Sequence, residues 1–231
     1  MAFPKINLSS FQRRALSALI GAPLFLIAIK NGEWPLLLIL GCAFCISVYE
    51  WYRLATKTGH FAMYMLTGII YMLCAYAAFY GLRELYSTNV VLLFIGMIWF
   101  SDTAAYFTGK LLGGPKLIVK ISPNKTWSGF GGAIFFPGLF AVLWVALFGF
   151  HENFNDLPWY DLYPVAFATG VCIGSIGQAG DLIVSFVKRR AKVKDTGSLI
   201  PGHGGILDRI DSMMLGAPVF FVLLEVLSYV L

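Results

Sequence analysis

The sequence predicts an all-α fold, a polytopic membrane helical bundle with about seven transmembrane helices, and three observations favour it. Of the 231 residues, 58% are hydrophobic and only 13% are charged. The mean hydropathy is +0.76, and apolar stretches of membrane-spanning length recur along the chain. A soluble protein of this size could not bury so much apolar surface, because polar residues must cover its exterior. We therefore expect a single integral membrane domain over residues 1–231.

Seven apolar stretches approach the roughly 20 residues that a helix needs to cross a bilayer. In chain order they cover about 15–29, 34–52, 61–82, 89–109, 129–150, 162–187 and 213–231. The first stretch is short, and no small-residue cleavage site follows it, so we expect a retained helix rather than a signal peptide. The sixth is long and carries Gly170, Gly174, Gly177 and Gly180, which would allow close helix packing or a break near its end.

The distribution of basic residues orients the predicted helices. With the N-terminus inside, the segments on that side carry 15 of the 17 Lys and Arg, and the opposite side carries only Lys30 and Arg83. This is the positive-inside pattern, which predicts a multi-pass protein of a bacterial inner membrane with its charged segments in the cytoplasm. The basic residues do not alternate with exposed aromatic residues, so we expect no nucleic-acid partner.

Aspartates near the inner ends of the predicted helices are the first candidates for a functional site. Asp102 and Asp181 lie near such ends, where an ionisable group is costly and by default indicates function. Asp208 and Asp211 are three residues apart and would share one face of a helix. Converging carboxylates supply the hard oxygen ligands of Mg²⁺, which usually accompanies phosphate. Each aspartate alone could instead cap a helix or pair with a nearby cation.

Glycines and cations beside these aspartates indicate a phosphate-binding site that faces the cytoplasm. Glycine permits close approach of the backbone to an anion, and Lys and Arg can neutralise phosphate oxygens. The glycines are Gly202, Gly204 and Gly205, and the cations are Lys125, Lys188, Arg189 and Arg209. His203 is expected to donate a hydrogen bond to phosphate or to hold the loop, because a phosphate monoester with a second pKa of about 6 needs no general base. The run Lys188-Arg189-Arg190 alone would indicate only contacts with membrane lipids.

These residues belong to motifs that together resemble one enzyme family. The longest motif runs Ser185-Phe186-Val187-Lys188-Arg189, then Lys194-Asp195, then Pro201-Gly202-His203-Gly204-Gly205-Ile206-Leu207-Asp208-Arg209-Ile210-Asp211-Ser212. Upstream lie Glu50-Trp51, Asp102-x-x-Ala105-Tyr106 and Ser122-Pro123-Asn124-Lys125-Thr126-Trp127-Ser128-Gly129. Over about residues 99–212, the expected catalytic part, the chain closely resembles the phosphatidate cytidylyltransferases, or CDP-diacylglycerol synthases. It departs from the family pattern at Val184, where an acidic residue is common, and at Asn124, where a lysine is usual.

The resemblance implies a nucleotidyltransferase of phospholipid biosynthesis that converts CTP and phosphatidic acid into CDP-diacylglycerol and pyrophosphate. It implies Mg²⁺ as the cofactor, with room for a second cation, and a homodimer. The implied catalytic residues are Asp181, Asp208, Lys188 and Arg209, and the implied metal ligands are Asp181, Asp208, Asp102 and Asp211. The implied substrate-binding residues are Ser122, Lys125, Thr126, Arg189, Gly202, His203, Gly204 and Gly205.

Two other kinds of function remain open from the sequence. A related membrane cytidylyltransferase or a CTP-dependent lipid kinase would act on another lipid acceptor. An ion-coupled transporter would use Asp102, Glu50 and Asp181 as intramembrane carboxylates. The candidate carboxylates lie near one face of the predicted bundle rather than at its middle, which favours an enzyme over a transporter.

Overall fold

The computed structural model describes residues 10–150, 158–197 and 204–230, which form seven α-helices and one small hairpin. The α-helices are α1 (Ser10–Asn31), α2 (Glu33–Ala55), α3 (Phe61–Gly81), α4 (Thr88–Leu112), α5 (Trp127–Phe148), α6 (Trp159–Arg190) and α7 (Leu207–Val230). A π-helical turn, η1 (Leu82–Tyr86), follows α3, and the antiparallel strands β1 (Lys116–Ile118) and β2 (Ser122–Thr126) lie between α4 and α5. The all-α membrane bundle is confirmed, and the hairpin is a local departure from it.

Six of these helices, α2 to α7, are long and apolar enough to cross a membrane. In α1 the described apolar part covers only Gly21–Asn31, which is shorter than a full span. Every predicted stretch corresponds to a helix, although α7 begins at Leu207 rather than near residue 213. The first turns of α7 therefore contain Leu207 to Ser212, the last part of the long motif.

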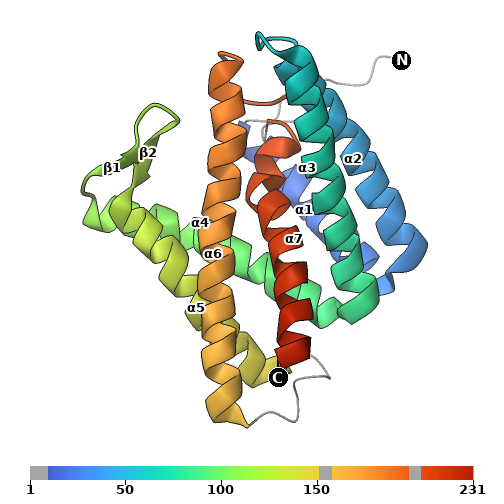
Figure 1. The fold of residues 1–231 in the computed structure, drawn as a ribbon, viewed down its shortest axis with the longest axis vertical. Coiled ribbons are helices and arrows are strands. Elements are labelled where there is room, and N and C mark those ends of the chain that lie inside the picture. The colour runs from blue at the N-terminus through green and yellow to red at the C-terminus, as the bar shows by residue number, and fades with distance from the viewer. Residues whose placement is uncertain (1–9, 151–157, 198–203, 231) are drawn as a thin grey trace.

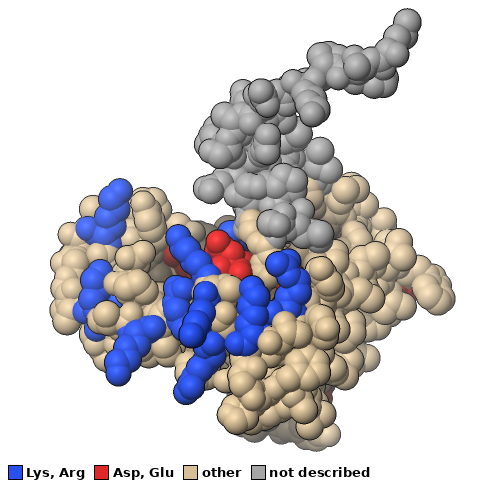
Figure 2. Space-filling model, turned by 90° about the horizontal axis from the view of Figure 1, so that it is seen from above, with Lys and Arg blue, Asp and Glu red and all other residues tan. Residues whose placement is uncertain are grey.

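Most basic residues gather at one end of the bundle. Figure 1 shows the α2–α3 connection, the hairpin and the C-terminal end of α6 in the upper part of the molecule, with the C-terminus at the bottom. We call this upper part the basic end, and its described Lys and Arg are Arg53, Lys57, Lys110, Lys116, Lys120, Lys125, Lys188, Arg189, Arg190, Lys192, Lys194 and Arg209. Figure 2 looks onto this end and shows basic side chains around a hollow in which acidic side chains are visible.

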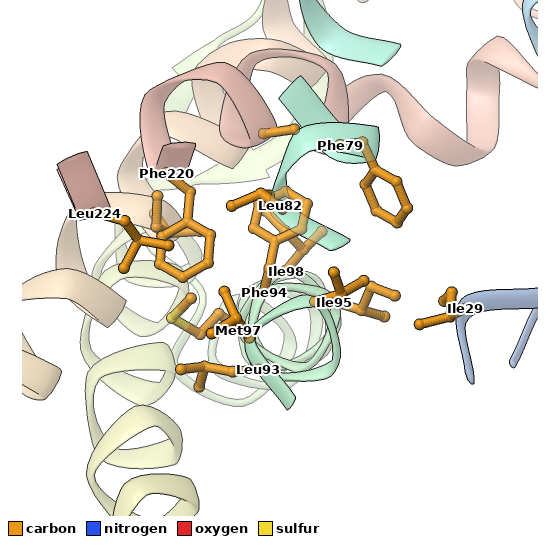
Figure 3. Packing of buried hydrophobic residues seen from close by; sticks show 14 of the residues in the cluster. Ile29, Phe79, Leu82, Leu93, Phe94, Ile95, Met97, Ile98, Phe220 and Leu224 are labelled. Atoms are coloured by element: carbon orange, nitrogen blue, oxygen red, sulfur yellow. The ribbon is translucent and has the colours of Figure 1, made fainter. Parts of the chain in front are cut away.

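Helix α4 forms the centre of the hydrophobic core. Figure 3 shows its residues Leu93 to Ile98 between side chains of α3 and α7. The ring of Phe94 stacks on Phe220 at a centroid distance of 5.6 Å and meets Phe79 at 6.2 Å in an edge arrangement. Because this core holds the first half of α4, the second half is carried in a defined position to the basic end.

Helices α5 and α6 pack very closely through small residues. A Cβ atom on Gly170 would lie 2.3 Å from the carbonyl oxygen of Pro137, and one on Gly174 would lie 2.3 Å from that of Ala133. Such spacing is available only to glycine, and small residues are the usual means of close packing between membrane helices. The glycines of α6 therefore serve close packing, and α6 continues without a break from Trp159 to Arg190.

Candidate active site

A polar cavity of about 570 Å³ opens at the basic end, bounded by α4, the hairpin, the start of α5 and α6. Two aspartates and three lysines line it: Asp102, Asp181, Lys110, Lys116 and Lys125. A cavity of this size lies within the range of small-molecule sites. The mixture of cations and carboxylates suits a ligand that carries phosphate groups together with a metal ion.

The motif from Ser122 to Thr126 forms strand β2 and then begins α5. Its partner β1 pairs Lys116 with Thr126 and Ile118 with Ser122. The hydroxyl of Thr126 accepts a hydrogen bond from the backbone N–H of Gly129 at 3.1 Å and so caps α5. Thr126 thus lines the cavity, whereas Ser122 pairs with Ile118 in the hairpin, and their predicted contacts with substrate stay predictions.

Lys125 joins the two aspartates of the cavity through a buried glutamine. Its ammonium nitrogen lies 2.5 Å from Oδ2 of Asp181 and donates to Oε1 of Gln178 at 2.8 Å. The Gln178 amide nitrogen donates in turn to Oδ1 of Asp102 at 3.0 Å. Gln178 is only 2% exposed, and sequence reasoning missed it because an isolated Gln carries no motif. The structure thus brings together three predicted residues that are far apart in sequence.

Asp211 approaches the same group from α7. A Cβ atom on Gly180 would lie 2.7 Å from the backbone oxygen of Asp211, so glycine is what allows α6 and α7 to meet here. The carboxylate of Asp211 interacts electrostatically with those of Asp181 and Asp102. With Lys125 beside them, the three carboxyl groups offer oxygen donors, which are the ligands that Mg²⁺ prefers.

The fit of these carboxylates to a metal ion is partial in this arrangement. In the described part of the chain, no three Asp, Glu, His or Cys side chains lie close enough together to hold an ion as they stand. The ammonium group of Lys125 already neutralises Asp181. A metal at this position would therefore require Lys125 to exchange its carboxylate partner for another anion, such as a phosphate group.

Asp208 has a different environment from the other three aspartates. Its Oδ1 accepts from the ammonium of Lys188 at 2.7 Å. Its Oδ2 accepts from the backbone N–H and the hydroxyl of Thr196 at 2.8 and 3.0 Å, and from the N–H of Gly205 at 3.2 Å. Oδ1 therefore ties the start of α7 to Lys188 of α6, while Oδ2 holds Thr196 and Gly205 of the segment before α7. The predicted roles of Asp208 as a metal ligand and of Lys188 as a phosphate contact stay predictions.

Glu50 of α2 fastens the same segment from the other side. Its side chain is 2% exposed and accepts from the hydroxyl of Thr196 at 2.9 Å and from the N–H groups of Ile206 and Leu207, both at 3.0 Å. These N–H groups belong to the start of α7, where a carboxylate is favourable. A Cβ atom on Gly205 would lie 2.0 Å from Oγ1 of Thr196, so this turn needs glycine. Glu50 is thus a positioning residue, which also argues against its use as a transport carboxylate.

The remaining predicted residues fall in several places. Arg189 donates to the backbone oxygens of Ile121 and Val193 at 3.0 and 3.2 Å, which ties the end of α6 to the hairpin. Arg209 lines a second cavity on another face of α7. Gly202 and His203 lie outside the described residues, and Gly204 adopts a left-handed φ of +83°. Among the departures from the family pattern, Val184 is fully buried and Asn124 lines the polar cavity.

Fold and site together define a multi-pass membrane protein with a polar, phosphate-suited centre at the basic end of its bundle. The chain belongs to the cytidylyltransferase family, whose family model matches residues 55–227. It is 36% identical over 214 residues to a phosphatidate cytidylyltransferase of Rickettsia felis, covering 90% of this chain and 89% of that protein. It is 35% identical over 218 residues to that of Rickettsia bellii, with 92% and 90% covered. It is 40% identical over 149 residues to that of Bacillus subtilis, with 64% and 50% covered. The predicted family is confirmed, and the chain is a nucleotidyltransferase.

Proposed function

We propose that this enzyme transfers the cytidylyl group of CTP to phosphatidic acid, at the cytoplasmic face of a bacterial inner membrane. The observation that carries the proposal is the polar cavity at the end of a membrane bundle, where Lys110, Lys116 and Lys125 face Asp102 and Asp181. A nucleotide from water and a phosphate group on a lipid can both reach such a position. The relatives named phosphatidate cytidylyltransferase support the same substrates.

The reaction needs positioning and charge neutralisation more than proton transfer. A phosphate oxygen of phosphatidic acid attacks the α-phosphorus of CTP, the bond from that phosphorus to the oxygen of the β-phosphate breaks, and pyrophosphate leaves. Phosphate monoesters are substantially dianionic near neutral pH, since their second pKa is about 6. Electrostatic preorganisation is therefore the main contribution that we expect from the protein.

Each lysine of the cavity has a defined part in this proposal. Lys125 lies beside the three aspartates, and its side chain is 21% exposed. Its ammonium group can therefore turn from Asp181 to a phosphate oxygen. Lys110 and Lys116 lie on the wall formed by α4 and β1 and would neutralise the rest of the triphosphate. Asp181, with Asp102 and Asp211, would hold Mg²⁺ once Lys125 turns away and the three carboxylates move closer together. When bound, Mg²⁺ would neutralise phosphate charge and stabilise the leaving pyrophosphate.

A product analysis tests this function. The purified protein is incubated with phosphatidic acid and CTP that carries a radioactive α-phosphate or, separately, a radioactive γ-phosphate. We expect the α-label in a nucleotidyl lipid and the γ-label in pyrophosphate. A γ-label in the lipid with release of CDP would indicate a lipid kinase, and solute transport without CTP consumption would contradict the enzyme.

The proposed orientation and homodimer need tests of their own. In a variant whose four native cysteines are replaced by serine, we expect Lys57→Cys, in the α2–α3 connection, to react with a membrane-impermeant reagent only after cells are opened. Labelling in intact cells would reverse the orientation. The homodimer, which rests on family resemblance, predicts a mass of two chains for the detergent-purified protein.

A further inference from the structure

A second cavity lies against α7, on a different face from the candidate aspartates. It has a volume of about 420 Å³ and is bounded by α1, α2, α3 and α7. It is lined by Ile206, directly before α7, and on α7 by Arg209, Ile210, Met213, Met214 and Ala217. Spacings of three and four residues place these side chains along one face of the helix. Asp208 and Asp211 do not line this cavity, so α7 is the wall between it and the aspartates.

The lining of this cavity, which we call the apolar groove, defines the chemistry of its occupant. Its walls are hydrocarbon apart from Arg209 and the hydroxyl of Tyr76, and that hydroxyl is already hydrogen-bonded to Ser47 at 2.9 Å. Arg209 lies in the first turn of α7, at the basic end. Arg209 also has a partner within the chain, but its guanidinium has five N–H donors. The groove therefore suits a molecule that is apolar along most of its length and carries negative charge at one end.

The dimensions of the groove match one half of a bilayer. Arg209 and Ala217 mark the extent of the groove along α7, and a rise of 1.5 Å per residue makes this span about 12 Å. One leaflet of a hydrocarbon core about 30 Å thick measures about 15 Å. The surrounding helices are themselves of membrane-spanning length and hydropathy, so lipid chains are the apolar molecules that surround the groove.

We propose that the apolar groove holds one acyl chain of the phosphatidic acid substrate, with the phosphate end toward the first turn of α7. This inference rests on the proposed function and specifies where its lipid substrate binds. Ile206 and Arg209 stand on either side of Asp208 in sequence, so a lipid that leaves the groove at this end comes close to Asp208 and to Glu50, which accepts from the N–H of Ile206. Because lipid chains are as apolar as the groove, selectivity comes from shape rather than from removal of water.

Two glycines offer a matched pair of variants. A Cβ atom on Gly21 or on Gly41 would meet nothing within 4 Å, so leucine can be introduced at either position without a clash at that atom. Gly21 lines the groove, whereas Gly41 lies on α2 and does not. Gly21→Leu should therefore obstruct the groove, and Gly41→Leu controls for a leucine in place of a glycine in a membrane helix.

The assay measures CDP-diacylglycerol formation from phosphatidic acids with long or short acyl chains, at equal surface concentration in one detergent. In Gly21→Leu we expect kcat/KM for the long-chain substrate to fall about tenfold. This is the lower end of the change in kcat/KM that one extra or missing methylene group causes in a hydrophobic pocket. The short-chain substrate should react at the wild-type rate, and Gly41→Leu should resemble wild type with both substrates.

Several results would overturn the inference. The groove would not bind the acyl chain of the substrate if Gly21→Leu lowered kcat/KM equally for both substrates or for neither. The same conclusion would follow if the variant changed only the mass of the assembly. If Gly21→Leu fails to fold, Ala43→Leu obstructs the same groove from α2 and takes its place. Wild-type protein that forms no CDP-diacylglycerol from any chain length would instead refute the proposed function.

A crosslinking experiment tests occupancy without relying on turnover. Phosphatidic acid and phosphatidylcholine, each with a diazirine in one acyl chain, are photolysed with the wild-type protein and digested. We expect phosphatidic acid to label the peptides containing Met213 or Tyr76, both of which line the groove, and Gly21→Leu to reduce that labelling. Equal labelling by phosphatidylcholine would mean that bulk lipid occupies the groove, which contradicts a substrate site.

Discussion

Replacing Glu50 with glutamine tests the claim that a residue of α2 positions the start of α7. The carboxylate accepts from Ile206 N–H through Oε1, and from Leu207 N–H and the Thr196 hydroxyl through Oε2. Glutamine has nearly the same shape but only one acceptor oxygen. Its best orientation keeps the two donors at Oε2 and turns an amide N–H toward the N–H of Ile206.

The size of the effect follows from these contacts. A hydrogen bond to a charged group contributes about 1.5–3 kcal/mol and a neutral one about 0.5–1.5 kcal/mol. Losing one bond and weakening two others costs roughly 3–5 kcal/mol. The neutral amide is cheaper to bury than a carboxylate, so we expect a net cost of about 2–3 kcal/mol. This cost corresponds to a factor of roughly 30 to 150 in the equilibrium constant for local opening.

Hydrogen exchange measures this cost at the atoms concerned. In Glu50→Gln the amides of Ile206 and Leu207 should exchange faster by that factor, and turnover should fall, because Thr196 also holds Asp208. Glu225→Gln is the control, since Glu225 accepts from the Tyr86 hydroxyl at 2.7 Å near the other end of α7. Unchanged exchange at the two amides in Glu50→Gln would refute the positioning role.

Further predictions concern the aspartates, the glycine turn and the metal. Asp181→Asn should abolish turnover while the protein stays folded in detergent; a wild-type rate would remove Asp181 from the site. Asp208→Asn should also abolish turnover but lower the melting temperature, because Asp208 holds Thr196 and Gly205; an unchanged melting temperature would contradict that structural role. Gly205→Ala should lower the free energy of unfolding by about 1–3 kcal/mol through overpacking, since its Cβ would lie 2.0 Å from Thr196 Oγ1. A denaturation midpoint equal to that of the wild type would disprove this. EDTA should stop CDP-diacylglycerol formation and Mg²⁺ should restore it, whereas full activity in EDTA would exclude a metal requirement.

The helices could be predicted closely because each one is a long apolar run, and the hairpin could not. Alternation of apolar and polar residues is the usual sequence signal of a strand, and a proline argues against one. Strand β2 contains Pro123 and shows no such alternation. The hairpin is instead closed by contacts at its base, such as the hydrogen bond from Trp127 N–H to the Pro115 oxygen at 3.1 Å. Such contacts depend on where α4 ends and α5 begins.

The candidate site was only partly predictable for a similar reason. Lys125, Asp102 and Asp181 were predicted from motifs, and the structure brings them to one cavity. Gln178, which joins them, has no sequence signal of its own. The four aspartates form one set in the sequence, but in the structure the carboxylate of Asp208 is hydrogen-bonded to Lys188 and Thr196, whereas Asp102 and Asp181 line the polar cavity.

The sequence by itself determined the membrane bundle, the basic end and the enzyme family, because these depend on composition, on charge along the chain and on long motifs. Only the tertiary structure decided which carboxylates act together. Glu50 meets Ile206 and Leu207 across 156 and 157 residues of chain, and Asp211 reaches Asp181 only because Gly180 lets α6 and α7 approach. Contacts of this kind are set by helix packing, which local sequence patterns do not encode.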